Sequence, residues 1–333
     1  MSEVSQTVLP RWRGFNLLEM FHTRSDRAFR EEDFRWIAEL GFDFVRLPMC
    51  YLLWTMDDDP LRIDEGALEG VDRAVELGER YGLHVSLNFH RAPGYSVNRE
   101  RAEPFDLWKD AAALEAFCLH WGTFAARYRG IPSERLSFDL VNEPPAPSDE
   151  GMTRADHERV VRAAVGAIRE QDPERLVMAD GLRWGRDPMP ELADIGIGQS
   201  CRGYDPHAVS HYGATWVQGQ TFPEPVWPGM EFRGERWDRA RLEQGYAPWA
   251  ELARSGVGVH CGECGGFNQT PHHVFLRWFR DVLDVLTGHG IGYALWNFRG
   301  AFGILDSGRS DVDYEEWRGH LLDRALLDLL QEF

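Results

Sequence analysis

The chain is poor in the features that mark secreted, membrane-bound and nucleic-acid-binding proteins. Its five cysteines are odd in number and irregularly spaced, so they form no disulfide framework and are compatible with a reducing compartment. No run approaches the roughly 18 apolar residues of a membrane span. The N-terminal segment also lacks the basic and apolar regions of a secretory leader. We therefore expect a cytoplasmic protein with no membrane partner.

Basic residues are scarce relative to acidic ones. Lys and Arg total 36 against 54 Asp and Glu, which gives a formal net charge of −18. This balance argues against nucleic acid, anionic membranes and polyuronate substrates as partners. Tryptophan, by contrast, is abundant at 13 residues. We expect most of these in the core, while exposed indoles are suited to stack on the flat faces of sugar rings.

Segments with strand character alternate with amphipathic helical patterns along the whole chain. The expected strands are 13–18, 42–47 (stopped by Pro48), 84–90, 136–141, 176–179, 208–211, 257–259 and 291–296. Eight strand-helix units at a spacing of roughly 40 residues predict a single (β/α)8 TIM barrel, with one catalytic domain over residues 1–333. A doubly wound open sheet is the alternative, but no G-x-G-x-x-G motif follows the first strand.

Two of the expected strands lead to a glutamate. The stretch LSFDLVNEPP presents Glu143 behind Asn142, and the strand that begins at Val257 leads through HCG to Glu263. Because the C-terminal ends of all barrel strands open onto one face, we expect the two carboxyls to share a site. Glycoside cleavage requires such a pair: one carboxyl protonates the leaving oxygen while the other meets the developing oxocarbenium ion.

Other interpretations of these features stay open. A non-catalytic carbohydrate-binding barrel would use the same fold and tryptophans, although it would not need both glutamates in register. A metal-dependent barrel hydrolase would need an H-x-H motif on the first strand, and none is present there. Cys261 and Cys264 form a C-x-x-C motif without a second ligand pair, so we expect buried thiols in place of a metal site.

Six segments at successive strand ends resemble glycoside hydrolase family 5, the cellulase-like retaining β-glycosidases of the barrel clan. The matching residues are Arg46 in VRLP, His90 in NFHRAPG, the triplet Asn142, Glu143 and Pro144, the pair His211 and Tyr212, Glu263 in GEC, and Trp296 in ALWNFRG. The triplet alone is a weak signal, whereas six matches in the family's order are a strong one.

The resemblance implies a double displacement without any cofactor. Glu143 would act first as general acid and then as base, and Glu263 would be the nucleophile of a covalent glycosyl-enzyme, with the carboxyls about 5 Å apart. Arg46 would lie beside Glu263 and favour its ionised form. Asn142 would bind the sugar 2-hydroxyl, and His90 another hydroxyl of the same sugar. The substrate would be a small neutral β-linked oligosaccharide of gluco, manno or galacto type.

The remaining family positions are less regular in this sequence. His211 and Tyr212 would orient the two acids, but the usual family spacing is His-x-Tyr, and here Gly213 stands where the tyrosine is expected. Trp296 would form the hydrophobic floor beneath the sugar. Candidates for flanking sugar subsites are Trp54, Trp108, Trp216 and Trp227.

Overall fold

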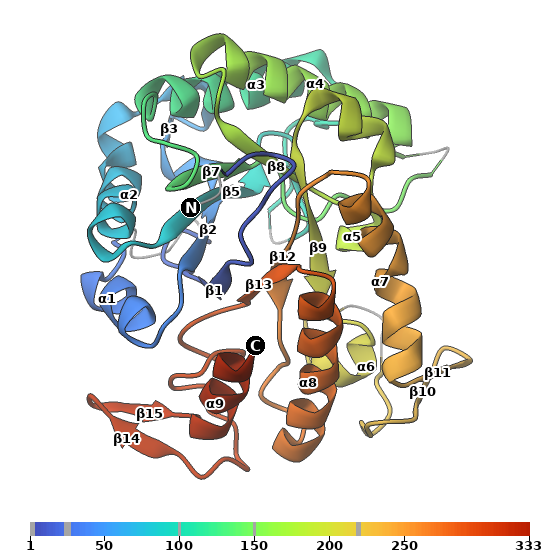
Figure 1. Ribbon diagram of the computed structural model, residues 1–333. Helices are drawn as coiled ribbons and strands as arrows, with labels where there is room; N and C mark the ends of the chain where they lie inside the picture. The colour runs from blue at the N-terminus through green and yellow to red at the C-terminus, as the bar shows by residue number, and fades with distance from the viewer. Residues whose placement is uncertain (1–3, 23–27, 99–100, 149–150, 218–220) are drawn as a thin grey trace.

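The computed structural model describes residues 4–22, 28–98, 101–148, 151–217 and 221–333, and its centre is a closed barrel of eight parallel strands (Figure 1). Going round the barrel, the strands are β1 (Arg13–Asn16), β2 (Phe44–Cys50), β5 (His84–Ala92), β7 (Leu136–Asp139), β8 (Leu176–Asp180), β9 (Gly198–Gly203), β12 (Val259–Cys264) and β13 (Gly292–Leu295). β13 pairs with β1 in parallel and closes the ring. The predicted (β/α)8 barrel is confirmed.

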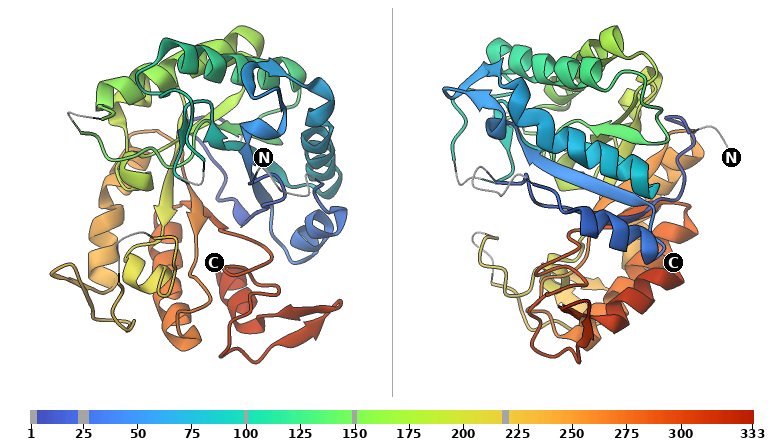
Figure 2. Two further views of the ribbon diagram at one scale, coloured as in Figure 1. Left: turned by 180° about the vertical axis from the view of Figure 1, so that it is seen from behind. Right: turned by 90° about the vertical axis from the view of Figure 1, so that its left-hand side faces the viewer.

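Helices surround the barrel on its outside, as the two views of Figure 2 show. They are α1 (Glu31–Glu39), α2 (Glu69–Tyr81), α3 (Ala111–Arg127), α4 (Arg154–Gln171), α7 (Arg239–Arg254), α8 (His272–Gly288) and α9 (Arg324–Glu332), with the short α5 (Leu182–Gly185) and α6 (His207–Ser210). Each long helix buries one apolar stripe against the strands; in α8 this stripe includes Phe275, Phe279 and Leu286. None of the helices in the described ranges is long and apolar enough to cross a bilayer.

Small elements extend the loops between the barrel units. Three are two-stranded hairpins: β3 (Thr55–Met56) with β4 (Asp59–Ile63), β10 (Met230–Phe232) with β11 (Glu235–Trp237), and β14 (Glu315–Trp317) with β15 (His320–Leu322). β6 (Tyr95–Ser96) folds back antiparallel onto the end of β5. Short 3-10 turns are η1 (Tyr51–Leu53), η2 (Glu65–Leu68) and η3 (Pro190–Ile195).

The barrel interior changes character along its axis. Phe44 of β2 and Met178 of β8 lie near the N-terminal ends of their strands and belong, with Trp12, to one buried apolar cluster. Side chains two residues apart on a strand point to the same face. Two residues beyond Phe44 and Met178 stand Arg46 and Asp180, which form a buried ion pair at 3.9 Å. The interior is therefore mainly apolar and aromatic at its base, whereas buried charged side chains gather at its mouth.

The prediction of the sixth strand was wrong. Residues 208–211 fall in α6 and just after it, and the sixth strand is β9, whose sequence is GQSCRG. This strand shows no apolar pattern because Ser200 and Arg202 face the polar interior, where Ser200 lines the same small cavity as Asp139. Gly203 is required for packing, since a Cβ there would lie 2.5 Å from the Cβ of Cys264.

Two smaller expectations also need correction. β2 continues through Pro48 to Cys50. Its β1 neighbour pairs only as far as Arg46, so the missing N–H of Pro48 breaks no ladder bond on that side. The sequence also predicts a last helix over 317–330, but this helix begins at Arg324, because residues 315–322 form the β14–β15 hairpin.

Candidate active site

Glu143 and Glu263 both stand at the mouth of the barrel. Glu263 is the last residue but one of β12, and its side chain is 4% exposed. Glu143 follows β7, and its side chain is 16% exposed. Glu143 has a φ of +49°, in the left-handed region that costs a non-glycine residue about 1 kcal/mol. The backbone N–H of Glu143 donates to Asp180 Oδ2 at 2.8 Å, and the backbone carbonyl of Glu143 accepts a hydrogen bond from the Tyr95 hydroxyl at 2.6 Å. These two bonds hold the strained backbone in place.

Arg46 lies beside Glu263, where the resemblance places it. Its guanidinium donates to Glu263 Oε1 at 2.8 Å, Asp139 Oδ2 at 2.7 Å, Asn16 Oδ1 at 3.0 Å and Asn142 Oδ1 at 2.8 Å. The residue is 1% exposed, so the bonds form in a low-dielectric interior, where hydrogen bonds between charged groups are strong. Arg46 thereby fixes both the carboxylate of Glu263, at the end of β12, and the amide of Asn142, which follows β7.

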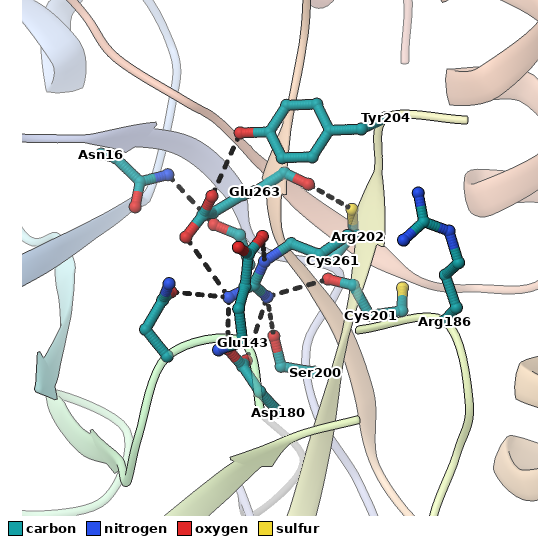
Figure 3. A network of polar contacts seen from close by, with 12 residues as sticks. Asn16, Glu143, Asp180, Arg186, Ser200, Cys201, Arg202, Tyr204, Cys261 and Glu263 are labelled. Atoms are coloured by element: carbon teal, nitrogen blue, oxygen red, sulfur yellow. Dashed lines mark hydrogen bonds and ion pairs between the residues drawn. The ribbon is translucent and has the colours of Figure 1, made fainter. Parts of the chain in front are cut away.

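A second buried arginine, Arg202 of β9, was not among the predicted site residues. Its Nε donates to Glu143 Oε1 at 3.2 Å, and its Nη2 lies 3.3 Å from Glu263 Oε1 (Figure 3). The same guanidinium forms ion-paired hydrogen bonds with Asp180 and donates to Asn142 Oδ1 at 2.9 Å. One cation therefore contacts both glutamates and brings them to within one guanidinium group of each other.

The tyrosine that reaches Glu263 is Tyr204, which follows β9 directly. Its hydroxyl donates to Glu263 Oε2 at 3.1 Å, and its ring packs edge-on against His211 with centroids 5.0 Å apart. Within the described ranges, neither His211 nor Tyr212 forms a hydrogen bond to either glutamate; His211 Nδ1 pairs with Ser210 Oγ at 2.8 Å. The motif at this strand end is thus Arg202-Gly203-Tyr204, in place of the expected His-x-Tyr. It was missed because the strand itself was misplaced.

An aromatic group lines the other side of the mouth. Phe21 contacts His90 at 4.4 Å and Trp296 at 5.5 Å between ring centroids, and His90 and Trp296 are 5.6 Å apart. Burial, followed by the charge of Arg46, holds the pKa of His90 well below its usual range, so its ring is neutral. The predicted pair His90 and Trp296 is therefore brought together on one wall.

Two buried side-chain nitrogens beside the glutamates lack a hydrogen-bond partner among the residues that the structure describes. They are Nδ2 of Asn142 and Nδ1 of His90. Asn142 has its Oδ1 occupied by both arginines, so its amide N–H groups are fixed in direction with nothing to receive them. Buried polar groups usually find partners, and an unpartnered donor at a barrel mouth is suited to bind a ligand hydroxyl.

The acidity of Glu143 is altered in the direction that acid–base work requires. Burial raises its pKa to about 7, the charge of Glu263 adds to this rise, and Arg202 opposes it. The pKa of Asp139 also rises to about 7, because of burial and the neighbouring Asp180. Near neutral pH Glu143 therefore holds a proton for part of the time, as a general acid must.

A cavity of about 380 Å³ lies next to Glu143. It is lined by residues 94–97, 105–106, 108, 145, 152 and 184. Trp108 and Trp184 contribute aromatic walls, and Trp184 is 41% exposed. Of the other tryptophan candidates, Trp216 is 54% exposed, while Trp54 and Trp227 are core residues at 0% and 3%. The last two are not free to stack on a sugar.

Comparison with known proteins gives matches over most of the chain. The model of the cellulase family, glycosyl hydrolase family 5, matches residues 3–301. Endoglucanase C of Acetivibrio thermocellus is 28% identical over 316 residues, which cover 87% of this chain and 90% of that protein. Cellodextrinase A of Ruminococcus flavefaciens is 28% identical, with 80% of this chain and 78% of that protein covered.

A solved structure described as a glycoside hydrolase is similar over nearly its whole length. It aligns with a TM-score of 0.93 at 42% sequence identity, covering 97% of this chain and 99% of that chain. The family match and this structural match both include the strands that carry the two glutamates.

Proposed function

The chain belongs to glycosyl hydrolase family 5, the cellulase family, and from that premise we propose that it is a retaining enzyme acting on short, neutral, β-linked gluco-oligosaccharides. An O-glycosyl hydrolase activity of the cellulase type follows from the family and its relatives. The observation that best supports a retaining mechanism is the contact of one guanidinium, that of Arg202, with both Glu143 and Glu263. Retaining enzymes hold their two carboxyls closer together than inverting enzymes, which place a water between theirs, and a shared guanidinium is suited to the closer arrangement.

The proposed reaction proceeds in two steps. In the first, a Glu263 oxygen bonds to the anomeric carbon, the bond from that carbon to the leaving oxygen breaks, and the proton of Glu143 moves to the leaving oxygen. In the second, water attacks the same carbon, its proton moves to Glu143, and the ester bond to Glu263 breaks. Both steps invert the carbon, so the configuration is retained overall. Neither step requires a cofactor.

The residues around the glutamates have suitable roles in binding the reacting sugar. The unpartnered Nδ2 of Asn142 would donate to the sugar 2-hydroxyl, and Nδ1 of His90 would bind a neighbouring hydroxyl. The ring of Trp296 would lie beneath the sugar, because it belongs to the same aromatic wall as His90. Arg46 and Tyr204 fix both oxygens of Glu263, which reduces the reorganisation needed for attack.

The cavity beside Glu143 is suited to hold the leaving part of the substrate. It lies next to the acid that would protonate the leaving oxygen, since Pro145 lines it and the cavity residue Tyr95 hydrogen-bonds to the carbonyl of Glu143. The exposed ring of Trp184 offers a flat apolar face of the kind on which sugar rings stack. The names of the relatives, an endoglucanase and a cellodextrinase, make cello-oligosaccharides the first substrates to test.

The experiment that tests this proposal follows the anomeric proton signals by NMR during hydrolysis of cellotetraose. We expect the β-anomer to appear first and the α-anomer to follow only by mutarotation. Initial release of the α-anomer would contradict retention. Aryl β-glycosides of glucose, mannose, galactose, xylose and cellobiose, compared by kcat/KM, would then define the sugar preference.

A further inference from the structure

We infer that Arg202 is the positioning residue that converts Glu143 from general acid into general base between the two steps. This inference rests on the proposed double displacement. Arg202 is suited to the role because it is the cation that contacts both carboxyls: Nε on Glu143 at 3.2 Å and Nη2 on Glu263 at 3.3 Å. In Figure 3 its guanidinium lies beside the side chain of Glu143, above Asp180 and Ser200.

The charges around the site balance differently before and after the first step. In the free enzyme the positive charge of Arg202 is shared among Asp180, Glu263 and Glu143, so Glu143 receives only part of it. Once Glu263 becomes a neutral glycosyl ester, Arg202 has lost one of its counter-charges while its bond to Glu143 Oε1 remains available. The carboxylate form of Glu143, which accepts the proton of the attacking water, then becomes favourable.

The other charged groups near Glu143 change less during this step. Arg186 lies nearby but forms a two-bond ion pair with Asp205 at 2.7 and 2.8 Å, which largely neutralises it. Arg46 contacts Glu263 as well, but within the described part of the chain its other ion pairs are with Asp139 and Asp180 and not with Glu143. Loss of the Glu263 charge acts on Glu143 directly, and Arg202, which contacts both carboxyls, adds to this effect in the same direction.

The residue type matters at this position. The family pattern His-x-Tyr places a histidine where this chain has Arg202, two residues before Tyr204. The two neighbouring site histidines, His90 and His211, have pKa values well below their usual range because they are buried. A histidine in the equally buried position 202 would be neutral for the same reason. Arginine supplies a charge that burial does not remove.

The test uses Arg202→His, which restores the family residue, and Arg202→Lys, which keeps a charge but cannot form both contacts. With a dinitrophenyl β-cellobioside, the leaving group needs no proton and hydrolysis of the ester limits the rate. We expect kcat for Arg202→His to fall by about 10- to 100-fold, the range of a weakened general base. KM should fall in parallel, so kcat/KM should stay within about threefold, and Arg202→Lys should lie between.

Azide provides the second readout, because it attacks the glycosyl ester without a general base. We expect azide to restore kcat in Arg202→His and to give the β-glycosyl azide, while leaving wild-type kcat nearly unchanged. A parallel loss of kcat and kcat/KM, or a loss that azide does not relieve, would overturn the inference.

Arg175→Lys is the matched control for burying a changed cation. Arg175 is buried like Arg202, but it bonds to Asp172 and to backbone carbonyls at the opposite end of the barrel. The Arg175→Lys substitution should lower thermal stability without any azide-dependent change in kcat. Failure of the double displacement itself would be visible separately, because the wild-type enzyme would then not be trapped by a 2-deoxy-2-fluoro glycoside.

Discussion

The two ends of the barrel both contain buried polar residues, but they use them differently. At the base, Trp12 stacks on His84 at 3.7 Å, and Phe44 stacks on His84 at 5.5 Å and contacts His260 at 4.5 Å. His84 has both ring nitrogens bonded, one to Glu134 O at 3.1 Å and one to Ser137 Oγ at 2.8 Å. At the mouth, four carboxyls share two arginines, and donors such as Asn142 Nδ2 are left without a partner.

This difference separates polar groups that stabilise the fold from those suited to bind and react. A satisfied, neutral histidine in an aromatic stack contributes to packing, and burial lowers the pKa of His84 and His260 to about 3. Crowded carboxyls and unpartnered donors reduce stability, and such groups are retained where they serve a ligand. Substitutions at the two ends should therefore affect different measurements.

The largest expected effect at the mouth is that of Glu263→Ala. We expect kcat to fall by on the order of 10⁵-fold, as when a nucleophile is removed. Sodium azide should occupy the space, attack the sugar directly and yield the inverted α-glycosyl azide, which NMR identifies. Azide turnover that gives only the β-product would contradict the role of Glu263 as nucleophile.

Glu143→Ala should give a loss that depends on the leaving group. For unactivated cello-oligosaccharides we expect kcat/KM to fall by about 10² to 10⁴-fold, and for a dinitrophenyl glycoside only slightly, because that leaving group needs no proton. The pH profile supplies an independent check. Since the pKa of Glu143 is raised to about 7, wild-type kcat/KM on unactivated substrates should decline above pH 7 as the acid loses its proton. An equal loss for all leaving groups would count against the acid assignment.

The smallest effect on activity is expected at the base, from His84→Phe. The ring stack with Trp12 is retained, so kcat should stay within about twofold. Two bonding partners, Glu134 O and Ser137 Oγ, lose their contact, which should cost about 1–3 kcal/mol of unfolding free energy at pH 7. Denaturant titration with parallel activity assays would measure both quantities.

The pH dependence of that stability difference has a defined sign. The folded-state pKa of His84 is lowered to about 3 from an ordinary 6.5, so burial favours the neutral ring. Its contribution is complete above pH 6.5 and is lost as the pH falls toward 3, at up to about 1.4 kcal/mol per pH unit. The difference between wild type and His84→Phe should therefore shrink on acidification. A difference that grows instead would mean that His84 is charged in the folded protein.

The parts of the molecule that could be predicted from the sequence are those with a repeated or positional signal. The barrel follows from regular alternation of apolar strands and amphipathic helices, and Glu143 and Glu263 follow from their place behind apolar strands. Arg46 was found for the same reason, as a charge at the end of an apolar run. Each of these three residues could be identified from the sequence immediately around it, because each lies at or just beyond the end of an apolar run.

Arg202 and Tyr204 could not be found in that way. β9 lacks apolar residues at alternate positions because its inward side chains meet other polar side chains in the barrel. The apolar pattern instead predicts a strand at 208–211. In the structure, Ala208 and Val209 are buried in α6, which packs against α8. Arg202 contacts Asn142, which lies 60 positions earlier in the sequence, and also the distant Glu263, and only the closed barrel brings these residues together.

The left-handed backbone of Glu143 sets stability and activity against each other at a single residue. Glycine tolerates that conformation without cost and asparagine at little cost, so either would relieve about 1 kcal/mol while removing the acid. A library of variants ranked only by heat resistance would therefore enrich inactive proteins at this position. Anyone engineering this barrel for durability should hold residue 143 constant and look for gains elsewhere.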